Sequence, residues 1–388
     1  MDAQASEVLL RFFRGIQEPR AANARHLLSD IMTIAIMAVL CGCDGWEMVE
    51  TWGLGNFEWL ATFLELPHGI PSHDTFDRVF CLLDPLAFER CFTNWTATLV
   101  HNSVGLFVAV DGKTLRRSWK HAWSKTPVHL VSAFATQNQL VLGQVATDAK
   151  SNEITAIPQL LAMLQLSGAT VTIDAMGCQR EIAAQIIGQK AHYILAVKEN
   201  QPKLHQQVKT LLDEAILDDF SEMSHGFYEQ SNDGHGRIEK RRVWVTDEVK
   251  WLGKDLLAAW PGLACLVVVE STRQDLGDLS GKISVERRYY ISSHTGTDSR
   301  WHAEAIRGHW CVENVLHWRL DVSMNEDQCR LRVKHGAENF SRLRRIAMNK
   351  LKRWEIKKAN GKVMKTSLRL KQKSCGWSRK FLVEALLV

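Results

Sequence analysis

Two aspartates each stand directly after an apolar run, and carboxylates in that position can bind a metal ion. Asp111 ends the run LFVAVD, and Asp174 ends the β-branched run ATVTID. If the two runs form neighbouring parallel strands, both carboxylates reach the edge of the sheet where open α/β sheets bind their ligands. Carboxylate oxygens are the ligands that hard cations such as Mg²⁺ prefer. The pair therefore suggests part of a metal site for phosphoryl transfer.

Asp111 also has a simpler interpretation, because Gly112 follows it. An Asp-Gly pair between two strand-like runs is a strong signal for a tight hairpin, since both residues tolerate positive φ. Judged on this segment alone, the hairpin is favoured. The metal-ligand interpretation becomes the better one because it accounts for Asp111 and Asp174 together, and their separation of 63 positions accommodates a hairpin and a crossover helix.

Metal sites for phosphate chemistry usually hold a third carboxylate, and one segment near the C-terminus offers candidates. His309, Glu313, His317 and Asp321 recur every four residues and so follow one face of a helix. Three interpretations are open: a hard-cation site completed by Glu313, a transition-metal site that uses the histidines, and an amphipathic helix whose histidines have partners in the core. Together with the two aspartates, the pattern favours an oxygen-rich Mg²⁺ site through Glu313. The other carboxylates that could serve are Glu153, Asp321, Glu326 and Asp327.

The elements that must position these residues change in character along the chain. Residues 1–100 carry apolar residues at helical spacing. Within them, the run IMTIAIMAVLCGC (31–43) is too short for the ~20 residues of a membrane span, so it predicts a buried helix. The segment GIPSHDTFDRVFCLLDP (69–85) predicts a turn and a helix, which fit either a helix-turn-helix or a helical bundle.

From residue 106 to residue 198 the pattern predicts strand, strand, strand, helix, strand, helix and strand, in that order. Such an order gives an α/β fold with a mixed sheet flanked by helices. Residues 201–296 interrupt it with strand-like runs and polar, Gly-containing turns, which predicts a mostly β insertion. Residues 300–321 then predict a helix with no internal proline.

The charge is divided unevenly along the chain. The net charge is +5, but residues 330–388 hold 18 Lys and Arg against 3 Asp and Glu. Such a tail suggests a polyanion partner, because Lys and Arg that neutralise phosphates release counterions. The apolar and aromatic residues among the charges predict a folded basic helix. Nine scattered cysteines and a start without a basic n-region indicate a cytoplasmic protein with reduced thiols, which would associate with the nucleoid if the polyanion is DNA.

The candidate carboxylates named above belong to longer segments that follow one another along the chain. The segments are VAVDGKTLRRS, KSNEITAIPQLL, VTIDAMGCQ, YILAVKENQP, HGRIEKRRVWVT, YYISS and HWCVENVLHWRLDVSMNEDQCR. In their sequence and order, and over about residues 30–353, they resemble the DDE-type transposases of bacterial insertion sequences, in the H-repeat-associated (ISAs-type) family. Several segments in the right order are far more specific than any single one.

The resemblance implies an RNase H-like catalytic fold with a β insertion before the last catalytic helix. It also implies a metal-binding catalytic triad, with Asp111 in the first acidic place, Asp174 in the second and Glu313 in the third. On this basis we expect a helical N-terminal domain (1–100), the first part of the catalytic core (101–200), a β-rich insertion (201–296), the last helix region of the core (297–335) and a basic C-terminal region (336–388).

The activity that the resemblance implies is metal-dependent cleavage of DNA at the ends of an insertion sequence, followed by strand transfer into target DNA. The expected cofactor is Mg²⁺ or Mn²⁺, as two ions. The expected partners are the element's terminal repeats and target DNA, bound by a homodimer, with no membrane and no nucleotide cofactor. The basic residues that could contact DNA are Lys113, Arg116, Arg117, Lys198, Arg307, His309 and Arg319.

The chain departs from the wider insertion-sequence clan around the glutamate, where a Tyr-x-x-Arg-x-x-x-Glu signature is expected. Ile306 and His309 stand in the two leading places, and Arg319 is the cation nearest to a lysine expected two turns later. Two other functions stay open. One is a catalytically idle, transposase-derived DNA-binding protein, which would bind DNA without metal-dependent cleavage. The other is a nuclease that hydrolyses DNA but never joins 3′-hydroxyl ends to a second DNA.

Overall fold

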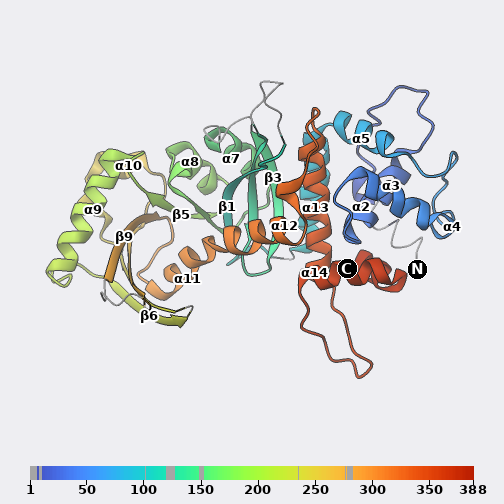
Figure 1. Cartoon of the computed structure of the whole chain (residues 1–388). Coiled ribbons are helices and arrows are strands. Elements are labelled where there is room, and N and C mark those ends of the chain that lie inside the picture. Colours follow the sequence, from blue (N-terminus) through green and yellow to red (C-terminus); the bar gives the residue numbers. More distant parts are fainter. Residues whose placement is uncertain are drawn as a thin grey trace. The chain divides into compact units, whose positions relative to one another are not determined.

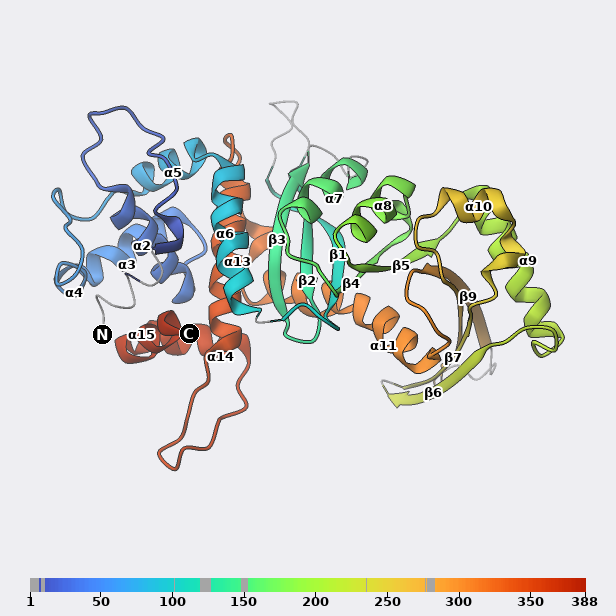
Figure 2. The same cartoon turned by 180° about the vertical axis from the view of Figure 1, so that it is seen from behind.

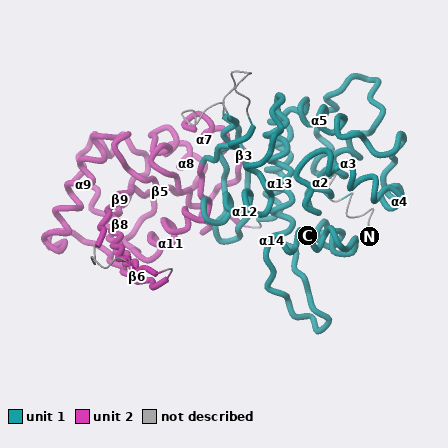
Figure 3. Tube along the Cα trace, viewed as in Figure 1, with its two compact units in different colours: residues 1–101, 112–152, 313–388 teal, residues 102–111, 153–312 magenta. Residues whose placement is uncertain are grey.

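The described chain forms two compact units, each assembled from segments that are distant in the sequence. A computed structural model describes residues 7, 11–100, 102–118, 127–147, 153–234, 236–275, 277 and 283–388 (Figures 1 and 2). Unit 1 combines residues 1–101, 112–152 and 313–388, and unit 2 combines residues 102–111 and 153–312 (Figure 3). Strand β1 (Phe107–Thr114) and the π-helical turn η5 (Val312–His317) each run from one unit into the other.

Unit 1 is mainly helical, as the spacing of apolar residues in its first hundred positions predicts. Its helices are α2 (Leu28–Leu40), α3 (Trp46–Gly55), α4 (Phe57–Leu60), α5 (His73–Leu82), α6 (Pro85–Leu99), α12 (Trp318–Val322), η6 (Glu326–Gln328), α13 (Gly336–Arg353), α14 (Leu368–Trp377) and α15 (Arg379–Leu387). The run from Asp30 to Leu40 in α2 is buried throughout, which confirms the predicted buried helix. Within the described ranges, no helix is long and apolar enough to cross a membrane.

Helix α13 is the central helix of unit 1, and both cartoon views show it between the N-terminal helices and strand β3 (Leu140–Thr147) (Figures 1 and 2). The prediction of a folded helix in the basic tail is confirmed, but the helix faces the interior instead of a polyanion. Its fully buried basic residues, each at most 1% exposed, are Arg342, Arg344, Arg345 and Lys350. Internal partners hold these charges, since Arg342 donates to the Glu89 carboxylate and Lys350 donates to the Leu386 carbonyl.

The strands of unit 1 form a small antiparallel arrangement. β2 (His129–Ala135) and β3 pair as a hairpin, with His129 opposite Thr147 at one end and Ala135 opposite Leu140 at the other. The strand order in this part of the sheet is β3-β2-β1. The predicted hairpin around the polar turn TQNQ is therefore confirmed.

Unit 2 holds a mixed sheet with the strand order β1-β4-β5-β9-β8-β7-β6. β1, β4 and β5 are parallel, and the remaining pairs are antiparallel. The strands are β4 (Thr170–Ile173), β5 (His192–Val197), β6 (Gly226–Gly234), β7 (Arg237–Thr246), β8 (Cys265–Asp275) and β9 (Ile283–Ser292). The helices are α7 (Glu153–Ala162), η3 (Ala175–Gly177), α8 (Arg180–Gly188), α9 (Pro202–Leu217), η4 (Val249–Leu252), α10 (Lys254–Ala259) and α11 (Ser299–His309). The predicted order of strands and helices from residue 106 to residue 198 is confirmed.

The segment 201–296 contains the predicted strands but also a long helix that the sequence analysis missed. α9 buries Leu204, Val208, Leu212 and Ala215, which recur at helical spacing, and Pro202 stands in its first turn, where proline is tolerated. The last strand, β9, pairs antiparallel with β5, from Ile194 opposite Ser292 to Val197 opposite Tyr289. The insertion is therefore continuous with the sheet that carries the two candidate aspartates.

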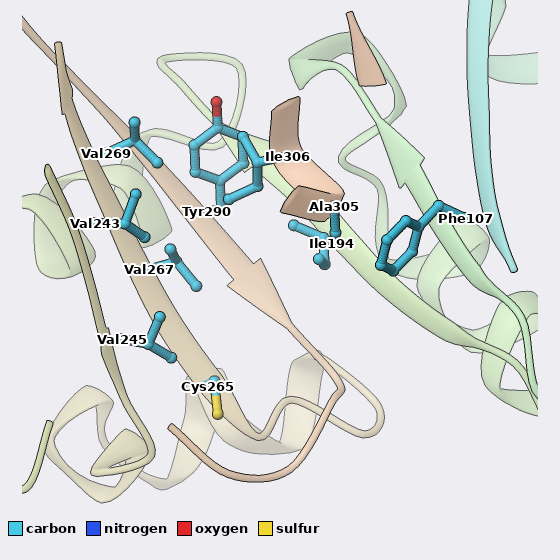
Figure 4. Close-up of a cluster of buried hydrophobic side chains, with 10 residues drawn as sticks. All are labelled: Phe107, Ile194, Val243, Val245, Cys265, Val267, Val269, Tyr290, Ala305 and Ile306. Carbon is cyan, nitrogen blue, oxygen red and sulfur yellow. The ribbon is translucent and has the colours of Figure 1, made fainter. Parts of the chain in front are cut away.

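One hydrophobic cluster fixes α11 against the sheet of unit 2 (Figure 4). Ala305 and Ile306 of α11 pack with side chains from five strands, among them Phe107 of β1, Ile194 of β5 and Tyr290 of β9. Full burial of one such apolar side chain stabilises a fold by roughly 1.5–3 kcal/mol. This packing determines where the C-terminal end of α11 lies relative to β1 and β4.

Candidate functional site

The two candidate aspartates directly follow the parallel pairing of β1 with β4 in unit 2. β1 and β4 are parallel neighbours, and the last pair in register is Val110 opposite Ile173. Asp174 directly follows β4, and Asp111 is the next residue of β1, so the two aspartates stand at matching positions just past the parallel pairing. Both residues are partly buried. β1 continues through Gly112 to Thr114, so the hairpin interpretation of Asp111 is wrong.

Asp174 ends its strand by capping the short helix η3. Its backbone is extended, with ψ 179°, and its Oδ1 accepts a hydrogen bond of 3.1 Å from the Met176 amide. Gly177 makes this tight turn possible, because a Cβ at that position would lie 2.3 Å from Cγ2 of Ile173. The segment VTIDAMG thus holds the Asp174 carboxylate in one place directly after the strand.

His309, at the end of α11, lies against the strand that carries Asp174. Its Nδ1 is 3.0 Å from Oγ1 of the buried Thr172, one of the last residues of β4. Burial lowers the pKa of His309, and the negative charge of Asp174 opposes that shift only in part. A neutral imidazole with a partner inside the fold favours a positioning role over the predicted phosphate contact. Sequence reasoning selected His309 but missed Thr172, because the two stand far apart in the chain.

The chain leaving β5 is tied to the turn that follows Asp174. Lys198, the first residue after the strand, is exposed. Asn200 donates to the Ala175 carbonyl at 2.5 Å, and Gln201 donates to the Cys178 carbonyl at 3.0 Å. Sequence reasoning selected only Lys198. The signal for the other two was the pair of consecutive amide side chains three and four positions after an apolar strand.

Glu313 lies in η5, the π-helical turn between α11 and α12. Such turns are rare and occur frequently at functional sites. The Glu313 side chain is exposed. Glu313 begins the last segment of unit 1, whereas Asp111 and Asp174 belong to unit 2, so the third position of the triad stays a prediction.

The donor chemistry of the two aspartates fits a hard divalent cation, because they offer carboxylate oxygens just past the pairing of two neighbouring parallel strands. Among the residues that the structure describes, no three or more His, Cys, Asp or Glu side chains converge as a complete metal site. The absence of such a group among the described residues applies equally to the transition-metal site that the histidines suggested. Burial, reinforced by the charges of Arg345 and Lys113, lowers the pKa of His317 to about 3 and keeps its imidazole neutral.

Lys113, two residues after Asp111, is buried in unit 1 among three carboxylates. Its Nζ lies 2.7 Å from Asp321, 2.9 Å from Asp327 and 3.7 Å from Glu326. Burial opposes the charge, but Glu326 and the other two carboxylates outweigh burial and raise the pKa of Lys113. This placement favours an internal ion pair over the DNA contact suggested by the sequence. It also occupies three of the carboxylates that were alternatives to Glu313.

Glu326 is the most deeply buried member of this cluster, and its charge should make stability depend on pH. Burial alone would raise its pKa, but Arg345, 2.9 Å away, and Lys113 lower the pKa to about 2. A carboxyl group whose folded pKa lies below its unfolded value of 4.5 stabilises the fold above that value and loses the effect as the pH falls toward 2.

We therefore expect the free energy of unfolding to decrease from about pH 4.5 to about pH 2, as the folded and unfolded states differ by up to one proton at Glu326. Asp321 acts in the opposite direction, because burial raises its pKa. Comparing the wild type with Glu326→Gln by urea denaturation across this pH range isolates the contribution of Glu326. An identical pH dependence in the two proteins would contradict the assignment.

The remaining cations predicted to bind DNA differ in how much of their charge is available. Arg307 and Arg117 are exposed. Arg116 is also exposed and lies 3.4 Å from Asp327. Arg319 is half-buried and donates to the Gln139 side chain at 3.0 Å. Exposed guanidinium groups suit phosphate contacts better than buried ones with partners, which favours Arg307 and Arg117.

Comparison with known protein families shows which family the chain belongs to. Residues 102–350 match a family described as "Transposase DDE domain", and residues 10–96 match one described as "DDE_Tnp_1-associated". The protein named "H repeat-associated putative transposase YhhI" from Escherichia coli K12 is 41% identical over 364 residues, which are 94% of this chain and 93% of that protein. "Putative transposase YncI" from Escherichia coli O157:H7 is 42% identical over 330 residues, which are 85% of this chain and 83% of that protein.

Among solved structures, a piggyBac transposase synaptic complex with hairpin DNA is similar with a TM-score of 0.39 and 10% identity. The match covers 98% of this chain and 77% of the other, and it is too weak to assign a fold. The family assignment therefore depends on the sequence matches, which span most of the chain at about 40% identity. The chain belongs to the DDE transposase family and is similar to its H repeat-associated members.

Proposed function

We propose that the protein is a DNA transposase that cleaves the ends of an insertion sequence and transfers them to target DNA. Asp111, Asp174 and Glu313 would hold the divalent cations, Mg²⁺ or Mn²⁺, expected as two ions. The observation that carries the proposal is the parallel pairing of β1 and β4 up to Val110 and Ile173, which supports one site for the carboxylates that follow. Membership in the DDE transposase family supports the same class of reaction.

The proposed catalytic fold is RNase H-like. An antiparallel β2–β3 hairpin followed by parallel β1, β4 and β5, in the strand order β3-β2-β1-β4-β5, supports this assignment. β6 to β9 then form the insertion between β5 and α11. In this arrangement the carboxyl ends of the parallel strands are the place where a ligand is expected.

In the proposed reaction, water attacks the phosphodiester at the element boundary and the 3′-oxygen leaves, which frees a 3′-hydroxyl. That hydroxyl then attacks a phosphodiester of the target in line and displaces a second 3′-oxygen. Bound divalent cations would supply the activation of the attacking oxygen and the stabilisation of the leaving one. No covalent enzyme intermediate is needed, so no nucleophilic side chain is required.

The chain's own residues would orient the DNA and keep the acidic site in shape. Lys198 and Arg307, both exposed in unit 2, are the proposed contacts to phosphates next to the scissile bond. His309 would hold β4 at Thr172 and so position Asp174. Because two element ends must be cut and joined, we propose that the active form is a homodimer on DNA.

The test is incubation of the purified protein with end-labelled DNA that carries its own element's ends and with a second, unlabelled DNA. We expect nicking at the element boundary with Mg²⁺ or Mn²⁺, no nicking with EDTA, and joining of the new 3′-ends to the second DNA. The products can be resolved on denaturing gels. Each of the three candidate functions gives a different pattern.

A nuclease would nick the substrate and leave the second DNA unjoined. A catalytically idle, transposase-derived protein would bind the element ends and cleave nothing with either metal. Cleavage that persists in EDTA would contradict the metal-dependent mechanism as a whole.

A further inference from the structure

The connection between α13 and α14 is a short lysine-rich hairpin, defined here as residues 356–365. Its backbone is paired, since the Lys358 amide donates to the Lys362 carbonyl at 2.9 Å and the Met364 amide donates to the Ile356 carbonyl at 2.8 Å. Gly361 turns the chain with φ +77°. Both cartoon views show this segment as a loop that extends away from the ends of the two helices (Figures 1 and 2).

The hairpin concentrates exposed positive charge without a compensating acid. Its four lysines, all exposed, are Lys357, Lys358, Lys362 and Lys365, and the segment holds no Asp or Glu. Within the described chain, no salt bridge or side-chain hydrogen bond engages their ammonium groups. Several other basic residues of the tail have internal partners instead. Arg342 of α13 donates to the Glu89 carboxylate, Lys350 of α13 donates to the Leu386 carbonyl, and Lys371 of α14 donates to the Leu351 carbonyl at 2.9 Å.

The register makes the arrangement unfavourable for the isolated protein. Lys357 pairs with Val363 across the hairpin, and the next pair inward places Lys358 opposite Lys362. Like charges directly opposite on two paired strands destabilise the pairing. A bound polyanion would neutralise both ammonium groups. The two facing lysines would then stabilise the complex instead of destabilising the hairpin.

We propose that the lysine-rich hairpin is a contact surface for the phosphate backbone of duplex DNA, independent of base sequence. The inference rests on the proposed function, which makes DNA the polyanion that this protein meets. Lysine is a compact, flexible point charge without the planar fork that arginine uses to read guanine, so these contacts would add affinity but little selectivity. The hairpin thus takes the role that the sequence suggested for the whole basic tail.

The experiment compares full-length protein with a variant in which the four hairpin lysines are replaced by glutamine. Binding to a random-sequence duplex is measured by fluorescence anisotropy over a series of KCl concentrations. Each phosphate contact contributes about 0.9 to the slope of log affinity against log salt. We expect the slope to become shallower by about 3–4 and the affinity at 0.1 M salt to fall by at least about 10-fold.

A matched control removes the same number of charges from exposed lysines of unit 2. The control positions are Lys190, Lys203, Lys209 and Lys254. An equal loss of slope in the control would overturn the inference, because any four charges would then serve. The ratio of affinities for element-end and random duplexes should stay unchanged in the hairpin variant, and a collapse of that ratio would overturn the sequence-independent assignment.

The outcomes distinguish a failure of the hairpin assignment from a failure of the proposed function. If the wild type binds no DNA, both fail together. If the wild type binds DNA and the hairpin variant keeps the same salt slope, only the hairpin assignment fails. Hairpin-dependent binding to vesicles of anionic phospholipid, together with an unchanged DNA slope, would identify a membrane surface as the partner and overturn the inference.

Discussion

Replacing Asp111 with asparagine is expected to lower the rate of strand cleavage at an element end by at least about 10³-fold, equivalent to about 4 kcal/mol of transition-state stabilisation. Asparagine keeps the size and shape of the side chain but removes the negative charge that a divalent cation requires. Asp174→Asn and Glu313→Gln should have losses of the same order, because the three carboxylates are proposed to act on one metal site. The measurement is the single-turnover cleavage rate with saturating protein and Mg²⁺.

The matched control is Glu199→Gln, which makes the same carboxylate-to-amide change at an exposed position just after β5. It should cleave at nearly the wild-type rate. All four variants should bind element-end DNA in EDTA as the wild type does, since the fold and the basic surfaces are intact. Near-normal cleavage by any one of the three triad variants would remove that residue from the site.

Replacing Lys113 with methionine is expected to lower the free energy of unfolding by about 3–5 kcal/mol. Methionine matches the length of the buried stem, but it leaves the carboxylates of Asp321, Asp327 and Glu326 facing one another without their shared cation. Removing the cation lowers the stability by more than the intact cluster contributes to it. The reason is that the remaining carboxylates stay buried, without either water or a positive partner. Urea denaturation at neutral pH measures the effect.

Arg116→Met is the natural control, because Arg116 approaches the same cluster from the surface at 3.4 Å from Asp327, with its side chain 81% exposed. Exposed pairs contribute about 0–1 kcal/mol, so this variant should be almost as stable as the wild type. Equal stability losses in the two variants would contradict the interpretation of Lys113 as the buried centre of the network. Unaltered stability in Lys113→Met would do so as well.

Most of the fold around the aspartates follows from local patterns in the sequence. Apolar runs that end in a carboxylate, a hairpin signal and a helix-strand alternation predict β1 to β5 in the right order, because these signals lie within a few residues of each other. The predicted parallel pairing of the two strands is confirmed by the register from Phe107 to Val110, and the convergence of Asp111 and Asp174 stays a prediction.

The partners of the charged residues could not be predicted in the same way. Lys113 meets Asp321, Glu326 and Asp327 more than 200 positions away, and Arg342 meets Glu89 across 253 positions. A lysine beside a basic loop and an arginine in a basic tail look like surface groups until the tertiary packing brings acids to them. The number of basic residues in the tail therefore predicts more exposed positive charge than the folded protein has. The lysine-rich hairpin provides part of the charge that is exposed.

Helix α9 was missed for a different reason. Its apolar stripe at Leu204, Val208 and Leu212 is narrow, and the strand-like runs that follow dominate the segment. The π-helical turn at Glu313, in contrast, had no local signal, since a regular helix and a π turn share the same composition. The turn depends on what its segment packs against, which a single sequence does not record.

Metal-directed cleavage of the polypeptide tests most directly whether Asp111, Asp174 and Glu313 belong to one metal site, as we propose. Fe²⁺ replaces Mg²⁺ in the complex with element-end DNA, and ascorbate with peroxide generates radicals that cut the chain beside the bound ion. We predict cuts next to all three residues in the wild type and loss of all three in Asp111→Asn. Cuts beside the two aspartates but none beside Glu313, or a pattern unchanged by Asp111→Asn, would contradict the site.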